Sequence, residues 1–248
     1  MGLRTFVASV SFTLKMYRLY WANLLSVTVL LPATYLAVIA IFSGGAPEPM
    51  VVGLTGYVVM TCFTTMVYPV ALQVANTFEE QVLELYASLP ISLGELLASI
   101  VASQLVFAAP ALVFGLMTLS LVTSWVNPAY VVASILLSIS VFSTLAVLLG
   151  LLFKSRYKLD PVLTLLMMLV VVVSPLYYKL GSLSSYWKVA LMVNPITHMI
   201  CLVREGVGLS EGVSPITSIA YLASLLVALI ALLLYKTRTG VLTVIEGR

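Results

Sequence analysis

The chain has 248 residues, of which 62% are hydrophobic and 8% are charged, and its mean hydropathy is +1.15. A water-soluble globular domain of this size does not tolerate so apolar a surface, so the composition excludes soluble enzymes and predicts a polytopic membrane protein. The net charge of +3 is too small to indicate nucleic-acid binding, and the basic residues are better interpreted as topology signals. We therefore expect an all-α integral membrane protein with no nucleic-acid partner.

Residues 2–22 have the pattern of an amphipathic helix rather than of a membrane span. Apolar and aromatic residues follow one stripe from Leu3 to Trp21, and three cations follow the neighbouring stripe. Such a helix lies in the membrane interface with its cations toward the lipid headgroups. The alternative is a helix that simply continues into the first span.

Six apolar runs follow, each near the roughly 20 residues that cross a hydrocarbon core of about 30 Å. They are predicted as transmembrane helices at 24–42, 51–75, 96–122, 129–153, 162–180 and 215–235. Six spans place both termini on one side of the membrane. That side holds nine of the twelve Lys and Arg residues, which predicts that it is cytoplasmic. We expect a single multi-pass domain, residues 1–248, in the plasma membrane.

The connection before the last apolar run is too apolar to be a solvated loop. Within residues 183–208 we expect two short helices, separated by Asn194 and Pro195, which enter the outer leaflet without crossing it. Irregular backbone at that depth must be buried in protein or line a cavity. A plain pair of interfacial helices that covers the bundle is the alternative.

The segment 76–95 is acidic and carries four of the nine acidic residues. Thr77 with Glu80, and Ser92 with Glu95, have the spacing of capping boxes, which begin helices. We expect a short amphipathic helix at 77–89, ended by the following proline.

These acids have no nearby basic residue in the sequence. Glu80 and Glu84 are like charges one helical turn apart, a pairing that destabilises a free helix. No Lys or Arg occurs between Arg18 and Lys154. A basic surface on a partner protein is the expected counterpart, and a solvated acidic face without a partner is the alternative.

The apolar runs contain essentially no ionisable side chain at mid-depth, which argues against proton relays and voltage sensors. Sodium sites made of hydroxyls and carbonyls remain open. No phosphate-binding loop and no zinc-protease motif occur, so we expect no catalytic residue and no nucleotide site in the chain. The chain has two cysteines, Cys62 in an apolar run and Cys201 in a predicted loop, so we expect no disulfide framework. The single histidine, His198, has no cluster of possible ligands around it in the sequence, so we expect no metal site.

Two segments resemble the ABC-2 type permeases, which are the membrane subunits of ATP-binding cassette exporters. The first is FEEQVLELYASLPISLGELLAS at 78–99, and the second is NPITHMICLVREGV at 194–207. The P-I-S form of the first segment is more similar to the drug-export branch than to the polysaccharide branch. Ile100 is a departure, because many relatives carry a lysine near this position.

The resemblance implies a subunit that pairs with a second copy or a paralogue and binds two copies of a separate cytoplasmic ABC ATPase. ATP and magnesium would be bound by that ATPase, and the chain itself would hold no cofactor. The helix at 77–89 would be the coupling helix that docks on the ATPase. The predicted coupling residues are Glu79, Glu80, Glu84, Leu85, Leu89, Pro90 and Glu95.

By the same resemblance, the second and fifth spans would line a path for export between the two permease subunits. The predicted lining residues are Tyr57, Thr61, Thr64, Thr65, Tyr68, Met167, Met168, Ser174, Tyr177 and Tyr178. The re-entrant segment would contribute Asn194, Pro195, His198, Arg204 and Glu205. Hydroxyl residues in spans also serve helix packing, which is the alternative for these positions.

The predicted path is aromatic and hydroxylated without a fixed charge, which favours an amphiphilic or lipid-like substrate, and membrane lipid is the expected surrounding partner. Two other classes of function stay open. One is an ion-coupled secondary transporter or channel, and the other is an assembly factor of a larger membrane complex.

Overall fold

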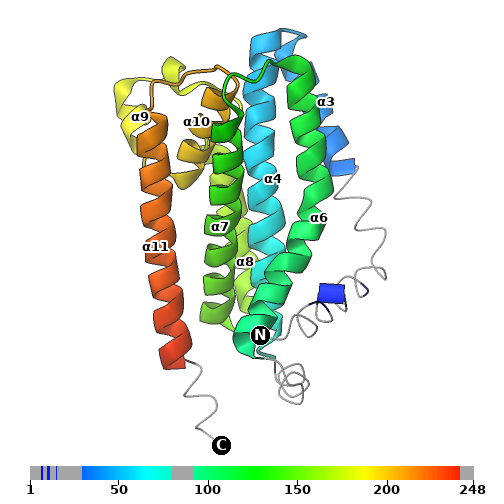
Figure 1. Cartoon of the computed structure of the whole chain (residues 1–248), viewed down its shortest axis with the longest axis vertical. Helices are drawn as coiled ribbons and strands as arrows, with labels where there is room; N and C mark the ends of the chain where they lie inside the picture. Colours follow the sequence, from blue (N-terminus) through cyan, green and yellow to red (C-terminus); the bar gives the residue numbers. More distant parts are fainter. Residues whose placement is uncertain (1–6, 8–9, 12–14, 16–29, 80–91, 241–248) are drawn as a thin grey trace, which may run out of the picture.

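The computed structural model describes residues 7, 10, 11, 15, 30–79 and 92–240 of the chain. Regular structure in these residues is helical throughout, in a bundle with its helices side by side (Figure 1). The α-helices are α3 (Leu31–Ser43), α4 (Pro47–Asn76), α6 (Leu93–Val122), α7 (Pro128–Phe153), α8 (Arg156–Val173), α9 (Ser185–Leu191), α10 (Pro195–Gly206) and α11 (Pro215–Gly240). A short 3-10 turn at Leu180–Ser182 lies between α8 and α9.

Four of these helices, α4, α6, α7 and α11, are long and apolar enough to cross a membrane. The pair α9 and α10 would make a fifth span if it crossed as one broken helix. The all-α prediction is confirmed, and the apolar helices are compatible with a multi-pass membrane protein. Six spans remain a prediction, because α3 has 13 described residues and α8 carries three charged residues among its 18.

Helix α4 is the centre of the bundle and contacts α3, α6, α7, α8 and α10. Of its most apolar stretch 89% is buried, compared with 28% for α6 and 11% for α11. The close approach of α6 and α7 to α4 depends on glycine. A Cβ on Gly115 of α6 would lie 2.5 Å from the Tyr57 ring, and a Cβ on Gly150 of α7 would lie 2.6 Å from Val74. Small residues at these crossings let the helices pack against α4, as in other membrane bundles.

The bundle has two distinct ends (Figure 1). The ends of α4, α7 and α11 and the starts of α6 and α8 lie together, and the cations Lys154, Arg156, Lys158 and Lys236 belong to this end. We call it the basic end. The opposite end holds α9, α10 and the connection to α11, and we call it the Arg204 end.

The helix predicted at 162–180 begins and ends earlier, since α8 runs from Arg156 to Val173. Ser174 has φ −87° and ψ 146° and leaves the helical region. The cause is Pro175, because a proline disfavours the α conformation of the residue before it. The chain from 174 to 184 then contains only the short 3-10 turn.

Of the two predicted capping boxes, the one at Ser92 and Glu95 is confirmed. The Ser92 hydroxyl accepts the Glu95 N–H at 3.3 Å, and the Glu95 carboxylate accepts the Ser92 N–H at 3.1 Å. The prediction for Thr77 is wrong, because α4 continues up to it: its backbone is still helical, at φ −66° and ψ −16°, and its hydroxyl donates to the Val74 carbonyl at 2.6 Å. An N-cap residue has an extended backbone instead.

The remainder of the predicted coupling helix, residues 80–89, lies outside the described residues, and so does nearly all of the predicted interfacial helix at 2–22. Cys201, expected in a loop, is buried in α10, and Cys62 is buried in α4; both thiols are free.

Candidate functional site

The non-helical segment 174–181 lies at the Arg204 end directly against α4. Ser174, Pro175 and Leu176 are buried. A Cβ on Gly56 of α4 would come within 2.4 Å of the Leu176 carbonyl oxygen, so only a glycine lets the segment pass this close. Carbonyl groups that have left a helix in an apolar environment require other hydrogen-bond donors.

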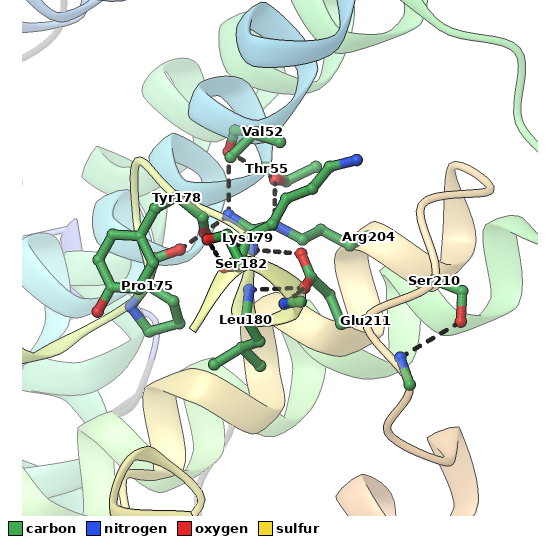
Figure 2. A network of polar contacts seen from close by, with 12 residues as sticks. Val52, Thr55, Pro175, Tyr178, Lys179, Leu180, Ser182, Arg204, Ser210 and Glu211 are labelled. Atoms are coloured by element: carbon green, nitrogen blue, oxygen red, sulfur yellow. Dashed lines mark hydrogen bonds and ion pairs between the residues drawn. The ribbon is translucent and has the colours of Figure 1, made fainter. Parts of the chain in front are cut away.

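Arg204 of α10 supplies those donors (Figure 2). Its side chain is 0% exposed. Nη2 donates to the Pro175 carbonyl at 2.8 Å, and Nη1 donates to the Tyr178 carbonyl at 3.0 Å. Toward α4, Nε donates to the Thr55 hydroxyl at 3.2 Å and Nη2 to the Val52 carbonyl at 3.5 Å. With the contact to Glu211, all five N–H groups of the guanidinium have an acceptor.

Glu211, in the connection from α10 to α11, balances the arginine charge. Its Oε1 accepts Arg204 Nη1 at 2.7 Å, and its side chain is 2% exposed. Its Oε2 accepts the backbone N–H of Leu180 at 2.7 Å and that of Gly181 at 3.3 Å. We call this network the Arg204 clamp; it consists of Val52, Thr55, Pro175, Tyr178, Leu180, Gly181, Arg204 and Glu211. Each buried charge has its partners, so the clamp joins α4, segment 174–181 and α10 rigidly.

Asn194 ties the other end of the segment to the start of α10. Its Oδ1 accepts the Ile196 N–H at 3.0 Å and caps the helix, and its Nδ2 donates to the Ser174 hydroxyl at 2.9 Å. Pro195 occupies the first helical position, where the missing N–H has no cost. Helices α9 and α10 are bent by 104° at this point, so the two predicted short helices are present. Whether they form a re-entrant loop stays a prediction.

The His198 side chain is held within the bundle by two polar contacts and an aromatic ring. Its Nδ1 lies 3.1 Å from the Ser218 hydroxyl of α11, its Nε2 lies 2.9 Å from the Met192 carbonyl, and its ring stacks on Tyr221 at 4.3 Å between centroids. Both ring nitrogens are thus in use within the bundle. Glu205, the last residue predicted for this segment, is half-buried at the end of α10.

The path residues predicted on α4 are mostly buried: Tyr57 is 2% exposed, and Thr61 and Thr65 are each 7% exposed. The hydroxyls of Thr64 and Thr65 donate to carbonyls of their own helix, at 3.0 Å and 2.6 Å for the shortest contacts. This bonding fits the packing alternative, since it leaves neither hydroxyl proton for a ligand.

An aromatic cluster joins the two predicted halves of the path. The Tyr35 ring of α3 lies 5.4 Å from that of Tyr57 and 5.9 Å from that of Tyr177, and the hydroxyls of Tyr35 and Tyr177 are hydrogen-bonded. Tyr35 was not predicted, although it is the only tyrosine of its apolar run. Met167 packs against the core, whereas Met168 is 64% exposed on α8.

A charged side chain lies beside Tyr68, one of the predicted path residues. The Tyr68 hydroxyl donates to the carboxylate of Asp160, which joins α4 to α8 near the basic end. Asp160 lies just before the predicted start of the fifth span, outside the predicted path. Arg156 precedes it by one helical turn on α8, so the acid has a cation nearby on its own helix.

Five of the predicted coupling residues, Glu80, Glu84, Leu85, Leu89 and Pro90, lie outside the described residues. Glu79 lies in the turn after α4, where its N–H donates to the Asn76 carbonyl at 3.2 Å. One carboxylate oxygen of Glu95 accepts hydrogen bonds from the Ser92 N–H and hydroxyl, and its predicted contact with a partner stays a prediction.

Comparison with known proteins gives no match: no protein-family model matches the chain, and no curated protein is significantly similar to it. In the described part of the chain, no group of three or more His, Cys, Asp or Glu side chains could hold a metal ion.

Proposed function

We propose that the chain is the permease subunit of an ABC-2 type exporter, which moves an amphiphilic or lipid-like substrate with energy from a separate cytoplasmic ATPase. The observation that supports this most is the bent pair α9 and α10. Asn194 and Arg204, the asparagine and the arginine of the second resembling segment, both hydrogen-bond to segment 174–181. The second resembling segment, 194–207, thus forms α10 and its contacts with segment 174–181, directly before the last helix, α11.

In this proposal the basic end is cytoplasmic, and the Arg204 clamp closes the outer end of the path. The predicted coupling helix precedes α6 in the chain, and α6 begins with the capping box of Ser92 and Glu95. Helix α6 packs on α4, and α4 carries Val52 and Thr55 of the clamp. A displacement at the ATPase would therefore pass through α6 and α4 to segment 174–181.

Charge reversal in the coupling segment tests the docking role. The probe is a cassette ATPase that binds the unmodified chain, sought first among proteins encoded by neighbouring reading frames. Glu80→Lys with Glu84→Lys is expected to weaken its binding at least about tenfold, because like charges across an interface are strongly unfavourable. Binding to the detergent-solubilised chain is the measurement. Glu48→Lys, a reversal at the Arg204 end on a side chain that is 62% exposed, is the control and is expected to bind normally. Unchanged binding of the double variant would refute the docking role.

Asp160 is the observation that favours the second candidate, an ion-coupled carrier, because an acid bonded to a hydroxyl between two helices can bind a coupling ion. Asp160→Asn distinguishes the two. An ATP-driven exporter retains ATP-dependent transport in this variant, whereas an ion-coupled carrier loses its response to an ion gradient.

A further inference from the structure

A groove opens on the side of the bundle between α6, α7 and α11, and no function is assigned to it above. Its volume is about 730 Å³, within the range of roughly 300–1,000 Å³ that is typical of ligand pockets. Small residues of α6, Gly94 and Ala98 among them, form one wall, and Val147, Leu233 and Leu234 form the other. Leu93, Leu97, Val101 and Leu105 of α6 also line the groove.

The walls of the groove favour a hydrocarbon occupant. The polar side chains in the lining are three hydroxyls, of Ser143, Thr144 and Thr237. Each donates to a carbonyl one turn earlier in its own helix, at 3.2 Å, 2.7 Å and 3.0 Å respectively. No hydroxyl proton therefore remains for a polar ligand, and the other lining residues are apolar. In a bilayer, the hydrocarbon adjacent to such a groove is a lipid acyl chain.

The charges at the mouth of the groove favour an anionic headgroup. The lining comes from the first turns of α6 and the last described turns of α11, so the groove lies at the basic end. Lys236 of α11 is exposed between the lining residues Leu234 and Thr237. Glu95 of α6 also carries a charge, but it does not line the groove, and its carboxylate is hydrogen-bonded to Ser92 at the start of the helix. A lysine can keep its ammonium at the headgroup level while its alkyl stem lies on apolar surface.

We propose that this groove binds one anionic phospholipid from the leaflet at the basic end, with an acyl chain between α6, α7 and α11 and the phosphate at Lys236. The chemistry of the groove carries this inference, which does not depend on the proposed transport function. A bound lipid here would seal the gap between α6 and α11.

Lipid retention is the test. The chain is reconstituted in nanodiscs of phosphatidylglycerol and phosphatidylcholine, and retained lipid is counted by native mass spectrometry. We expect one retained phosphatidylglycerol per chain. Ala98→Phe, which fills the groove, should lower retention at least about tenfold, because it displaces several methylene groups from apolar contact. Ala109→Phe is the matched control: it is also exposed on α6 but does not line the groove, and it should retain lipid normally.

Headgroup selectivity tests the role of the lysine. Lys236→Ala should lower the preference for phosphatidylglycerol over phosphatidylcholine about fivefold, and Lys236→Arg should restore it.

Equal lipid retention in Ala98→Phe and Ala109→Phe, or a preference that Lys236→Ala leaves unchanged, would overturn the proposal. So would efficient disulfide formation between two copies of Ala98→Cys, since the groove would then be a subunit interface. Transport by these variants plays no part in the decision.

Discussion

Replacement of Arg204 by methionine is expected to destabilise the protein by about 3–5 kcal/mol, because it leaves the Glu211 charge buried without its partner. The carbonyls of Pro175 and Tyr178 would lose their donor in the same variant. The free energy of unfolding in mixed detergent micelles, titrated with dodecyl sulfate, is the measurement.

Two comparison variants make this result specific to the clamp. Lys179→Met removes the ion pair with Glu48, whose side chains are 37% and 62% exposed, and should cost less than about 1 kcal/mol. Combining Arg204→Met with Glu211→Gln removes both charges and should recover part of the loss. If Arg204→Met stayed within about 1 kcal/mol of the unmodified chain, the clamp would not hold segment 174–181.

Gly56→Ala is the second substitution with a large expected effect. The added Cβ would lie 2.4 Å from the Leu176 carbonyl oxygen and 3.0 Å from two further backbone atoms of Leu176. Segment 174–181 must move, and the hydrogen bonds of Arg204 to it lengthen. We expect a loss of about 2–4 kcal/mol in the same unfolding measurement, from overpacking and weakened charged hydrogen bonds.

Gly53→Ala is the matched control on the same helix. Its Cβ would have its nearest contacts with the side chain of Ile39, at 3.0 Å, so a shift of a few tenths of an ångström relieves them and no backbone atom must move as far as at Gly56. Alanine also favours a helix over glycine by about 1 kcal/mol, so the net change should be small. Equal stabilities of the two variants would show that segment 174–181 does not depend on close contact at Gly56.

Long apolar runs explain why the four long apolar helices α4, α6, α7 and α11 could be predicted to within a few residues. Burial within the bundle could not be predicted, because the spans are apolar both toward lipid and toward protein. Helix α4 illustrates this: its hydropathy of 1.7 is the lowest of the four, yet it is the most buried. In a membrane protein, hydropathy therefore identifies a span without showing which helix is central.

The end of α8 and the partners of Arg204 are two further features that could not be predicted from the sequence. The apolar run continues past Val173, so the predicted span continued too, although Pro175 ends the helix. Arg204 was selected from the resemblance, but its partners Thr55 and Glu211 were not. They are distant in the sequence or lie in an unremarkable loop, and only tertiary packing brings them together.

The proposed function requires that the chain moves its substrate only together with a separate ATPase. The most direct test is efflux of a fluorescent amphiphile from proteoliposomes that contain the chain with the cassette ATPase that binds it. We expect transport that requires ATP, magnesium and both proteins, and no ATP hydrolysis by the chain alone. Transport by the chain alone, driven by an ion gradient and unaffected by ATP, would contradict the claim.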